Sequence, residues 1–383
     1  MPRILPARGA LTEGRDVTFD VRSLLAPGVE TIESYQAGKP LSELARECGI
    51  NDAIKLASNE NPLGPSRRAV EAARAALDDI ARYPDGRGYA LKRALADRLK
   101  VSSSQVTLGN GSNDVLELIV RTFAADGDEV IHSQYAFAMY GSFARAVGAR
   151  PVVAPARQWA HDLAAMRRAL TARTRLVFIA NPNNPTGTWT AREELEQFLS
   201  ALAPRVMVVL DEAYFEYVDE PAYPDALSMI ARYPNLIVTR TFSKVYGLAG
   251  LRVGYGISGP EVAAYLDRVR QPFNVNSVAA AAAEAALADE EHFQQSIDIN
   301  REGMRQLRDG FERLGLTYIP SVANFLTVDL GRPAGPIHEA LLRHGVIVRS
   351  VAAYNMPNHL RVTVGLPEEN GRFLRTLQAV MLR

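Results

Sequence analysis

The chain has 383 residues, of which 47% are hydrophobic, so it can bury a large core and form two or three domains. Its 43 basic residues equal its 43 acidic residues, so the charge gives no indication of binding to nucleic acid or to an anionic membrane. A single cysteine, Cys48, excludes disulfides within the chain and cysteine-based metal sites. The six histidines show no metal-ligand spacing, so we expect no metal.

The first 30 residues are irregular and punctuated by proline and glycine, which is typical of an arm rather than a core element. They lack the apolar core of a signal peptide, and no segment approaches the roughly 18 apolar residues that a membrane helix requires. We therefore expect a cytoplasmic protein with an N-terminal arm over residues 1–40.

Regular elements are predicted from about residue 66 onward. Residues 55–65 form a loop rich in asparagine and proline, and a helix should begin near Ser66. Residues 106–114 indicate a strand, a glycine turn and the start of a helix. Short apolar runs then alternate with amphipathic segments, at residues 129–132, 151–154, 176–180, 206–210 and 236–239. This alternation predicts an α/β fold with a mostly parallel sheet and helices on both faces.

The pattern changes after about residue 290. Apolar residues at helical spacing predict a long helix from Phe293 to Leu314, and strands are predicted at residues 325–328, 346–348 and 360–364. We expect a smaller α+β domain here. The predicted division is therefore an arm over residues 1–40, a large domain over 41–285 and a small C-terminal domain over 286–383.

The stretch around Lys244 is the first candidate site. Only 5 of the 43 basic residues are lysines, and Lys244 is the only one after position 100. An amine can form a Schiff base with a carbonyl, whereas a guanidinium stays protonated. Thr241, Ser243 and Arg252 are anion-binding residue types close to it in sequence, which suggests a phosphorylated aldehyde such as pyridoxal phosphate. The alternative is an ordinary loop between a strand and a helix that carries a solvated lysine.

Two polar clusters, residues 181–187 and 211–214, directly follow apolar runs. They are expected at the carboxyl ends of strands, where ligands bind in this architecture. Asp211 could pair with the pyridine nitrogen of pyridoxal phosphate, and Asn184 and Tyr214 could hydrogen-bond its phenolic oxygen. A structural role is the alternative for each residue taken alone.

Residues 254–259 match G-x-G-x-x-G, the motif of dinucleotide-binding enzymes. The motif lies deep in the chain, Pro260 follows it directly, and no acidic residue stands about 20 positions further on to bind a ribose. We therefore do not predict a dinucleotide site.

The ordered set of motifs at residues 181–187, 211–214 and 241–244, with Arg252 eight residues later, resembles the aspartate aminotransferase superfamily of pyridoxal-phosphate enzymes, fold type I. Further motifs resemble its histidinol-phosphate aminotransferase branch, at residues 35–40, 58–62, 82–86, 136–140 and 248–252. The resemblance covers the chain from about residue 30 onward and implies that the large domain binds pyridoxal phosphate.

The resemblance implies a role for individual residues around the cofactor. Lys244 would be the Schiff-base lysine, Asp211 the partner of the pyridine nitrogen, and Phe137 the aromatic residue stacked on the ring. Tyr83 would reach the cofactor phosphate of a neighbouring subunit, which implies a homodimer. The phosphate would be held by the N–H groups of Ser112 and Asn113 and by the side chains of Thr241, Ser243 and Arg252.

The same resemblance implies the substrate site. Arg361 matches the arginine that binds an α-carboxylate, and Arg349 matches the arginine associated with a substrate phosphate. Tyr35 and Asn324 match positions that line the pocket.

The implied reaction is a ping-pong amino transfer between histidinol phosphate or imidazole-acetol phosphate and glutamate or 2-oxoglutarate, in histidine biosynthesis. Lys244 would act as general acid and base at a lowered pKa. The alternatives are an aromatic amino-acid aminotransferase that accepts phenylpyruvate, a threonine-phosphate decarboxylase, and a cofactor-binding protein without turnover.

Overall fold

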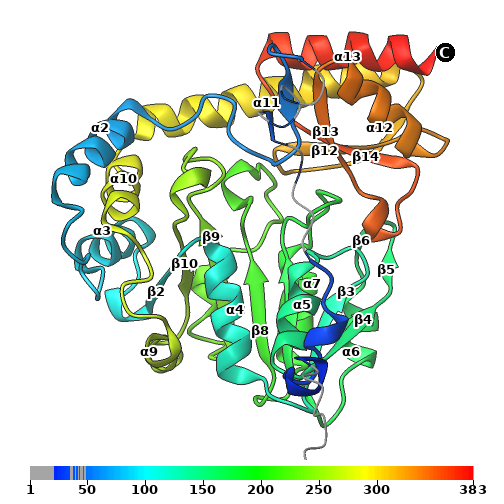
Figure 1. The fold of residues 1–383 in the computed structure, drawn as a ribbon. Coiled ribbons are helices and arrows are strands. Elements are labelled where there is room, and N and C mark those ends of the chain that lie inside the picture. Colours follow the sequence, from blue (N-terminus) through cyan, green and yellow to red (C-terminus); the bar gives the residue numbers. More distant parts are fainter. Residues whose placement is uncertain are drawn as a thin grey trace, which may run out of the picture.

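The computed structural model describes residues 21–34, 38, 40, 41, 43, 46 and 49–382. A seven-stranded sheet forms the centre of the molecule (Figure 1). Its strands lie in the order β2 (Val106–Gly109), β10 (Gly254–Ile257), β9 (Leu236–Thr241), β8 (Met207–Asp211), β7 (Thr174–Ala180), β3 (Glu129–Ser133) and β4 (Arg150–Ala154). Only β10 runs antiparallel to its neighbours. The predicted mostly parallel sheet is therefore confirmed.

Helices cover both faces of this sheet, because neighbouring residues of each strand point to opposite sides. On β7, Val177 and Ile179 pack into one buried cluster, whereas Leu176 and Phe178 pack into the other. The helices between residues 67 and 287 are α2 (Arg67–Ala76), α3 (Tyr89–Leu99), α4 (Ser112–Phe123), α5 (Met139–Ala146), α6 (Leu163–Arg168), α7 (Arg192–Ser200), α8 (Ala226–Met229), α9 (Pro260–Val269) and α10 (Ser277–Leu287). The predicted helix start near Ser66 is confirmed, since its side chain accepts a hydrogen bond from the N–H of Ala69 and caps α2.

A second, five-stranded sheet lies above the first in Figure 1. Its order is β1 (Ile54–Leu56), β13 (Val346–Ser350), β14 (His359–Thr363), β12 (Phe325–Asp329) and β11 (Thr317–Ile319), and helices α12 (Ala334–Arg343) and α13 (Pro367–Met381) pack beside it. The predicted small α+β domain is thus present. One detail differs from the prediction: residues 55 and 56, which we predicted as part of a loop, belong to β1, and this strand pairs in parallel with β13. Leu56 is buried in the core of the second sheet, and this burial draws β1 to it.

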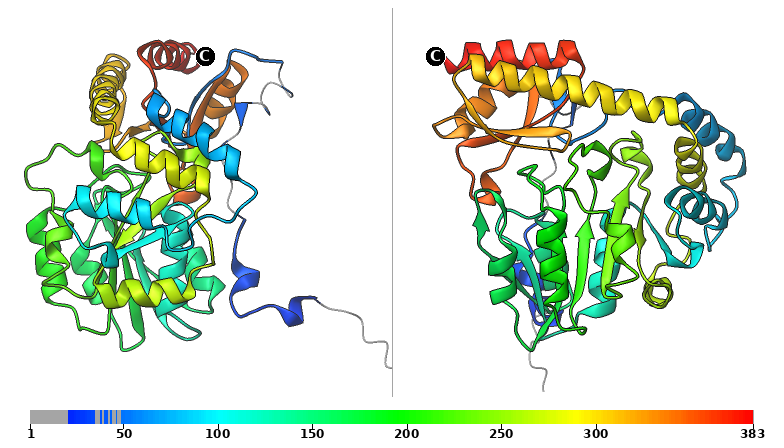
Figure 2. Two further views of the ribbon diagram at one scale, coloured as in Figure 1. Left: turned by 90° about the vertical axis from the view of Figure 1, so that its left-hand side faces the viewer. Right: turned by 180° about the vertical axis from the view of Figure 1, so that it is seen from behind.

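Helix α11 (Glu290–Arg313) joins the two cores. Phe293 and Ile297 in its first half pack against the core of the large sheet, while Leu307 and Phe311 in its second half are buried in the core of the small sheet. Figures 1 and 2 show this helix running along the top of the molecule from α2 and α10 to α13. The long helix predicted from Phe293 to Leu314 is confirmed, and it does not belong to one domain alone.

Strand β10 explains the G-x-G-x-x-G string at residues 254–259. Gly254 to Ile257 form a buried antiparallel strand between β2 and β9, so the string does not form a turn between a strand and a helix. A Cβ atom on Gly254 would lie 2.3 Å from the backbone nitrogen of Ser112, which explains why glycine stands there. This strand was not predicted from the sequence.

The connecting segments contain short 3-10 helices, η1 (Val21–Leu24), η2 (Val29–Thr31), η3 (Leu77–Asp79), η4 (Ser103–Gln105), η5 (Phe215–Tyr217), η6 (Ala249–Leu251) and η7 (Ala352–Tyr354), and the hairpin of β5 (Ala156–Arg157) and β6 (Ala160–His161). Across the described residues, no helix has the length and apolar character needed to cross a membrane. No group of His, Cys, Asp or Glu side chains suited to a metal ion is found in this part of the chain.

Candidate active site

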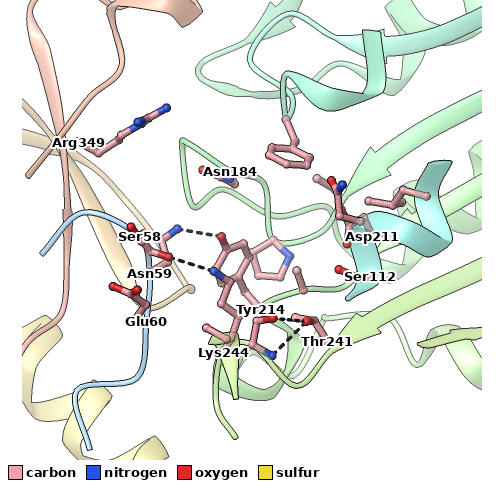
Figure 3. A pocket seen from close by; sticks show the side chains of 18 of the residues that line it. Ser58, Asn59, Glu60, Ser112, Asn184, Asp211, Tyr214, Thr241, Lys244 and Arg349 are labelled. Carbon is pink, nitrogen blue, oxygen red and sulfur yellow. Dashed lines mark hydrogen bonds between the residues drawn. The ribbon is translucent and has the colours of Figure 1, made fainter. Parts of the chain in front are cut away.

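A cavity of about 290 Å³ lies between the two sheets, at the carboxyl ends of β7, β8 and β9. This edge of a parallel sheet is the usual ligand site of such folds. The large domain contributes the end of β8, the loops after β7 and β9, and the start of α4, whereas β13 and β14 contribute from the second sheet. Figure 3 shows the side chains from these segments converging on one space.

Lys244 lies in the loop after β9, and its Nζ donates a hydrogen bond of 3.1 Å to the carbonyl oxygen of Ser58. The amine lies 5.5 Å from the centre of the Tyr214 ring. Burial, with the positive charge of Arg361 as the next cause, lowers the pKa of Lys244 to about 7. An amine in this state is available as a nucleophile or a base near neutral pH.

Asp211 ends β8 and is 6% exposed. Its Oδ2 accepts a hydrogen bond of 2.7 Å from the hydroxyl of Tyr140, and its Oδ1 accepts one of 3.2 Å from Thr239. Burial raises the pKa of Asp211, while these hydrogen bonds act in the opposite direction. A carboxylate fixed in this way at the cavity wall can bind a protonated ring nitrogen.

Asn184 and Tyr214 both line the cavity, as expected, and in this structure they bind protein groups. The hydroxyl of Tyr214 accepts a 2.8 Å hydrogen bond from Asn59 Nδ2, and burial raises its pKa to about 12. Asn184 Oδ1 accepts a hydrogen bond from Arg361 Nη1. Phe137 also lines the cavity, and its ring contacts Tyr140 edge to face at 5.7 Å.

The five residues predicted to hold a phosphate come together at one end of the cavity: Ser112, Asn113, Thr241, Ser243 and Arg252. Helix α4 begins there, and its N-cap residue Gly111 offers no side chain to its first N–H groups. Thr241 Oγ1 lies 3.0 Å from Ser243 Oγ, and Arg252 Nη1 lies 3.4 Å from the same oxygen. Backbone N–H groups, two hydroxyls and a guanidinium together form a site that can bind an anion.

The fit of this end of the cavity to a phosphate also depends on glycine. Gly111 has φ of 86°, and a Cβ atom there would lie 2.4 Å from Arg252 Nη2. Because Gly111 gives α4 no side-chain cap, the first N–H groups of the helix are available as donors to an anion. The residues present therefore fit the phosphate of pyridoxal phosphate.

Two arginines line the cavity from the second sheet. Arg349 on β13 and Arg361 on β14 are direct partners in the antiparallel ladder, so their side chains leave the same face of the sheet. Arg361 is 7% exposed, donates to Asn184 and to the carbonyl oxygen of Ala57 at 2.7 Å, and lies 5.3 Å from the Phe325 ring. The guanidinium groups give this side of the cavity an affinity for anions.

Two predicted site residues among those that the structure describes are not part of the cavity wall. Tyr83 is 83% exposed and its ring stacks on Phe273 at 4.7 Å, away from the site. Asn324 is buried behind the wall and donates to the carbonyl oxygen of Asn59 at 3.0 Å, so its contact with the cavity is indirect. The prediction for Tyr35 lies outside the described residues.

Several residues at the cavity had no role predicted from the sequence. Ser58, Asn59 and Glu60 follow β1 and line the cavity beside Lys244. These residues belong to the motif at residues 58–62, which carries part of the family resemblance but was given no chemical role. Tyr140 belongs to the motif at residues 136–140, and nothing in the pattern indicated that its hydroxyl would reach Asp211.

Comparison with known proteins identifies the class. The family model described as aminotransferase class I and II matches residues 51–377, so the chain belongs to this family. A histidinol-phosphate aminotransferase of Pseudomonas fluorescens strain Pf0-1 is 58% identical over 363 residues, covering 94% of this chain and 98% of the relative. One from Nitrosococcus oceani is 55% identical over 358 residues, with 94% and 97% covered.

Within the class, the chain thus belongs to the histidinol-phosphate aminotransferases. The crystal structure of the Sinorhizobium meliloti histidinol-phosphate aminotransferase in complex with pyridoxal-5'-phosphate is similar in fold, with a TM-score of 0.87. It is 30% identical, and the match covers 96% of this chain and 99% of that one. The fold and family that the sequence resembled are therefore confirmed.

We predict that Gly111→Ala weakens the anion site. The new Cβ atom would displace Arg252, and a non-glycine residue at this φ is strained as well. Affinity for pyridoxal phosphate, measured by fluorescence titration of the apoprotein, should fall at least tenfold, the effect of about 1.4 kcal/mol. Gly259→Ala is the matched control, since a Cβ atom there has nothing within 4 Å. Equal affinities for the two variants would contradict the assignment.

We also predict that Lys244 reacts with amine reagents at an unusually low pH. Its labelling in the apoprotein, followed by peptide mass spectrometry over a pH series, should reach half its maximum near pH 7. Because Arg361 lowers the pKa of Lys244, Arg361→Met should move this midpoint upward. A midpoint that does not move in the variant would show that the two charges do not interact.

Proposed function

We propose that the chain catalyses amino transfer between histidinol phosphate or imidazole-acetol phosphate and glutamate or 2-oxoglutarate, with pyridoxal phosphate as cofactor. The observation that carries the proposal is the placement of Lys244 and Asp211 in one cavity with an anion site at one end and two arginines at another side. The family to which the chain belongs supports the choice of reaction. Without the arginine pair, the same cavity would suit many amino acids.

Three groups would hold the cofactor. Lys244 would bind it covalently, the donors at the start of α4 with Thr241, Ser243 and Arg252 would hold its phosphate, and Asp211 would bind its ring nitrogen. Phe137 would cover one side of the ring. When bound, pyridoxal phosphate supplies an electron-withdrawing ring that stabilises negative charge on the substrate carbon.

The side chains then provide proton transfer and orientation. Lys244 Nζ, with its pKa near 7, can take a proton from the substrate carbon and return it nearby. Asp211 stabilises positive charge on the ring nitrogen. Asn59 holds the hydroxyl of Tyr214 at the cavity wall, and Tyr214 keeps its proton at neutral pH because its pKa is about 12. Tyr214 is therefore a hydrogen-bond donor for the cofactor or substrate.

The arginines would select the substrate. Histidinol phosphate carries a phosphate arm and no carboxylate, whereas glutamate presents carboxylates only. Both kinds of anion can be bound by the same pair, Arg349 and Arg361, because a guanidinium binds carboxylates and phosphates with two parallel N–H groups. An uncharged aromatic side chain gains nothing from Arg349, which favours the phosphorylated substrate over phenylpyruvate.

We predict that Arg349→Ala lowers kcat/KM for histidinol phosphate by roughly 30-fold or more, because loss of one partner of a desolvated charge pair costs about 2–5 kcal/mol. The glutamate half-reaction should lose less, and a phenylalanine half-reaction should change little. Arg361→Ala should impair every amino acid substrate, because each presents an α-carboxylate. The matched control is Arg343→Ala, an exposed arginine at the end of α12, which should retain normal kinetics. Unchanged kinetics with histidinol phosphate in Arg349→Ala would favour an aromatic aminotransferase.

We further propose that the chain forms a homodimer in which Tyr83 reaches the partner's cofactor site. Tyr83 stands among other exposed apolar side chains of this region, which suits a buried contact with a second copy: Leu77, Ile80, Tyr89 and Phe273.

The division into an arm, a cofactor-binding domain and a small domain remains a prediction. The cytoplasmic location likewise stays a prediction from the amino-terminal sequence.

Subunit complementation tests the shared site. Tyr83→Ala and Lys244→Ala should each be nearly inactive, but a hybrid dimer contains one site with both native residues. Denaturing and refolding the two variants together should therefore give activity that exceeds either parent. Tyr265→Ala, another exposed tyrosine, should remain active by itself. If the mixture is no more active than its parents, Tyr83 does not act across subunits.

A further inference from the structure

Tyr140 is a fully buried tyrosine in the first turn of α5 whose hydroxyl reaches the cavity wall. Its ring stacks on Phe178 of β7 with centroids 4.5 Å apart and planes within 6°, and Phe137 contacts it edge to face. Packing on these sides fixes the direction of the hydroxyl, which donates a 2.7 Å hydrogen bond to Asp211 Oδ2. Nothing in the sequence pattern predicted this contact.

The direction of the hydrogen bond is determined by the chemistry of the pair. Burial raises the pKa of Tyr140 well above 10, so the phenol keeps its proton and must be the donor. Asp211 Oδ1 accepts from Thr239 at 3.2 Å, and the N–H of Ala213 also stabilises the charged carboxylate. Because both carboxylate oxygens accept hydrogen bonds, protonation of either one would weaken a donor contact.

These hydrogen bonds oppose the free-energy cost of burying a charged carboxylate. Burial is the main cause that raises the pKa of Asp211, and the Tyr140 hydrogen bond is first among the causes that lower it. The other charged or titratable groups that act on or respond to Asp211 are Lys244, Glu212, Tyr214 and Tyr223. Glu212 is paired with Arg240 at 2.7 Å. Of the two side-chain hydrogen bonds to Asp211 described above, the one from Tyr140 is the shorter, at 2.7 Å against 3.2 Å from Thr239.

We propose that Tyr140 is a positioning residue that keeps the Asp211 carboxylate ionised and directed into the cavity, so that the cofactor ring nitrogen can stay protonated. The inference rests on the proposed function, because it assumes that Asp211 binds the pyridine nitrogen of pyridoxal phosphate. One proton is then shared between this nitrogen and the carboxylate. Loss of the Tyr140 hydroxyl raises the proton affinity of Asp211, and the shared proton moves from the nitrogen toward the carboxylate.

Tyr140→Phe removes the hydroxyl and keeps the ring on Phe178. The test is the ¹⁵N resonance of the pyridine nitrogen in protein loaded with ¹⁵N-labelled pyridoxal phosphate, recorded over a pH series. In the wild-type protein, this resonance should stay at the protonated position through neutral pH. In Tyr140→Phe it should shift toward the unprotonated position, and kcat should fall about tenfold, the equivalent of one pKa unit.

Two further variants separate positioning from packing. Tyr233→Phe is the matched control, since Tyr233 is also buried and its hydroxyl has no hydrogen-bond partner within the described residues. It should leave the ¹⁵N resonance unchanged. In an Asp211→Asn background, Tyr140→Phe should cause no additional shift, because the amide has no charge to retain. A purely structural role for Tyr140 would give the same additional effect in both backgrounds.

The possible results decide between the inference and the proposed function. If the wild-type protein binds pyridoxal phosphate and Tyr140→Phe leaves the ¹⁵N resonance at the wild-type position, the role of Tyr140 is disproved and the proposed function stands. The same holds if Tyr233→Phe shifts the resonance equally. If the wild-type protein does not bind the cofactor, the proposed function fails, and the role of Tyr140 fails with it.

Discussion

The burial of a carboxylate at the wall of the cavity is the constraint on which the site depends. Asp211 ends a strand whose other residues are almost all buried, and an isolated charge there would be very unfavourable. The surrounding elements supply compensation from different directions: α5 through Tyr140 and β9 through Thr239. The large sheet and its helices therefore serve as a scaffold that holds hydrogen-bond donors against the two carboxylate oxygens of Asp211.

The alternation of side chains along β9 shows how closely this compensation is built into the sheet. Thr239 and Thr241 point toward the site, where one binds Asp211 and the other belongs to the anion site. Arg240, between them, forms a buried ion pair with Glu212 and lies 3.5 Å from the Phe215 ring centre. Because successive residues of a strand face opposite sides, a shift of one residue in this strand would exchange these roles.

Much of this arrangement could be predicted from the sequence, because strand ends in a parallel sheet gather at one edge. The predicted cluster of Lys244, Asp211, Asn184 and Arg252 is a direct consequence of that rule. Contacts between elements far apart in the chain could not be predicted in this way. The hydrogen bond of Tyr140 depends on the exact packing of α5 on β7, and the position of Asn324 behind the wall depends on how the loop after β1 enters the site.

The pairing of β1 with β13 has a consequence for how the molecule is assembled during synthesis. The strands of the large sheet lie between Val106 and Ile257, so that sheet can form while the rest of the chain is still being made. The small sheet cannot be completed in the same order, since Ile54 pairs with Val346 near the other end of the chain. The segment that carries Ser58 and Asn59 must therefore wait for the last strands to emerge from the ribosome, and the active site closes only at the end of folding.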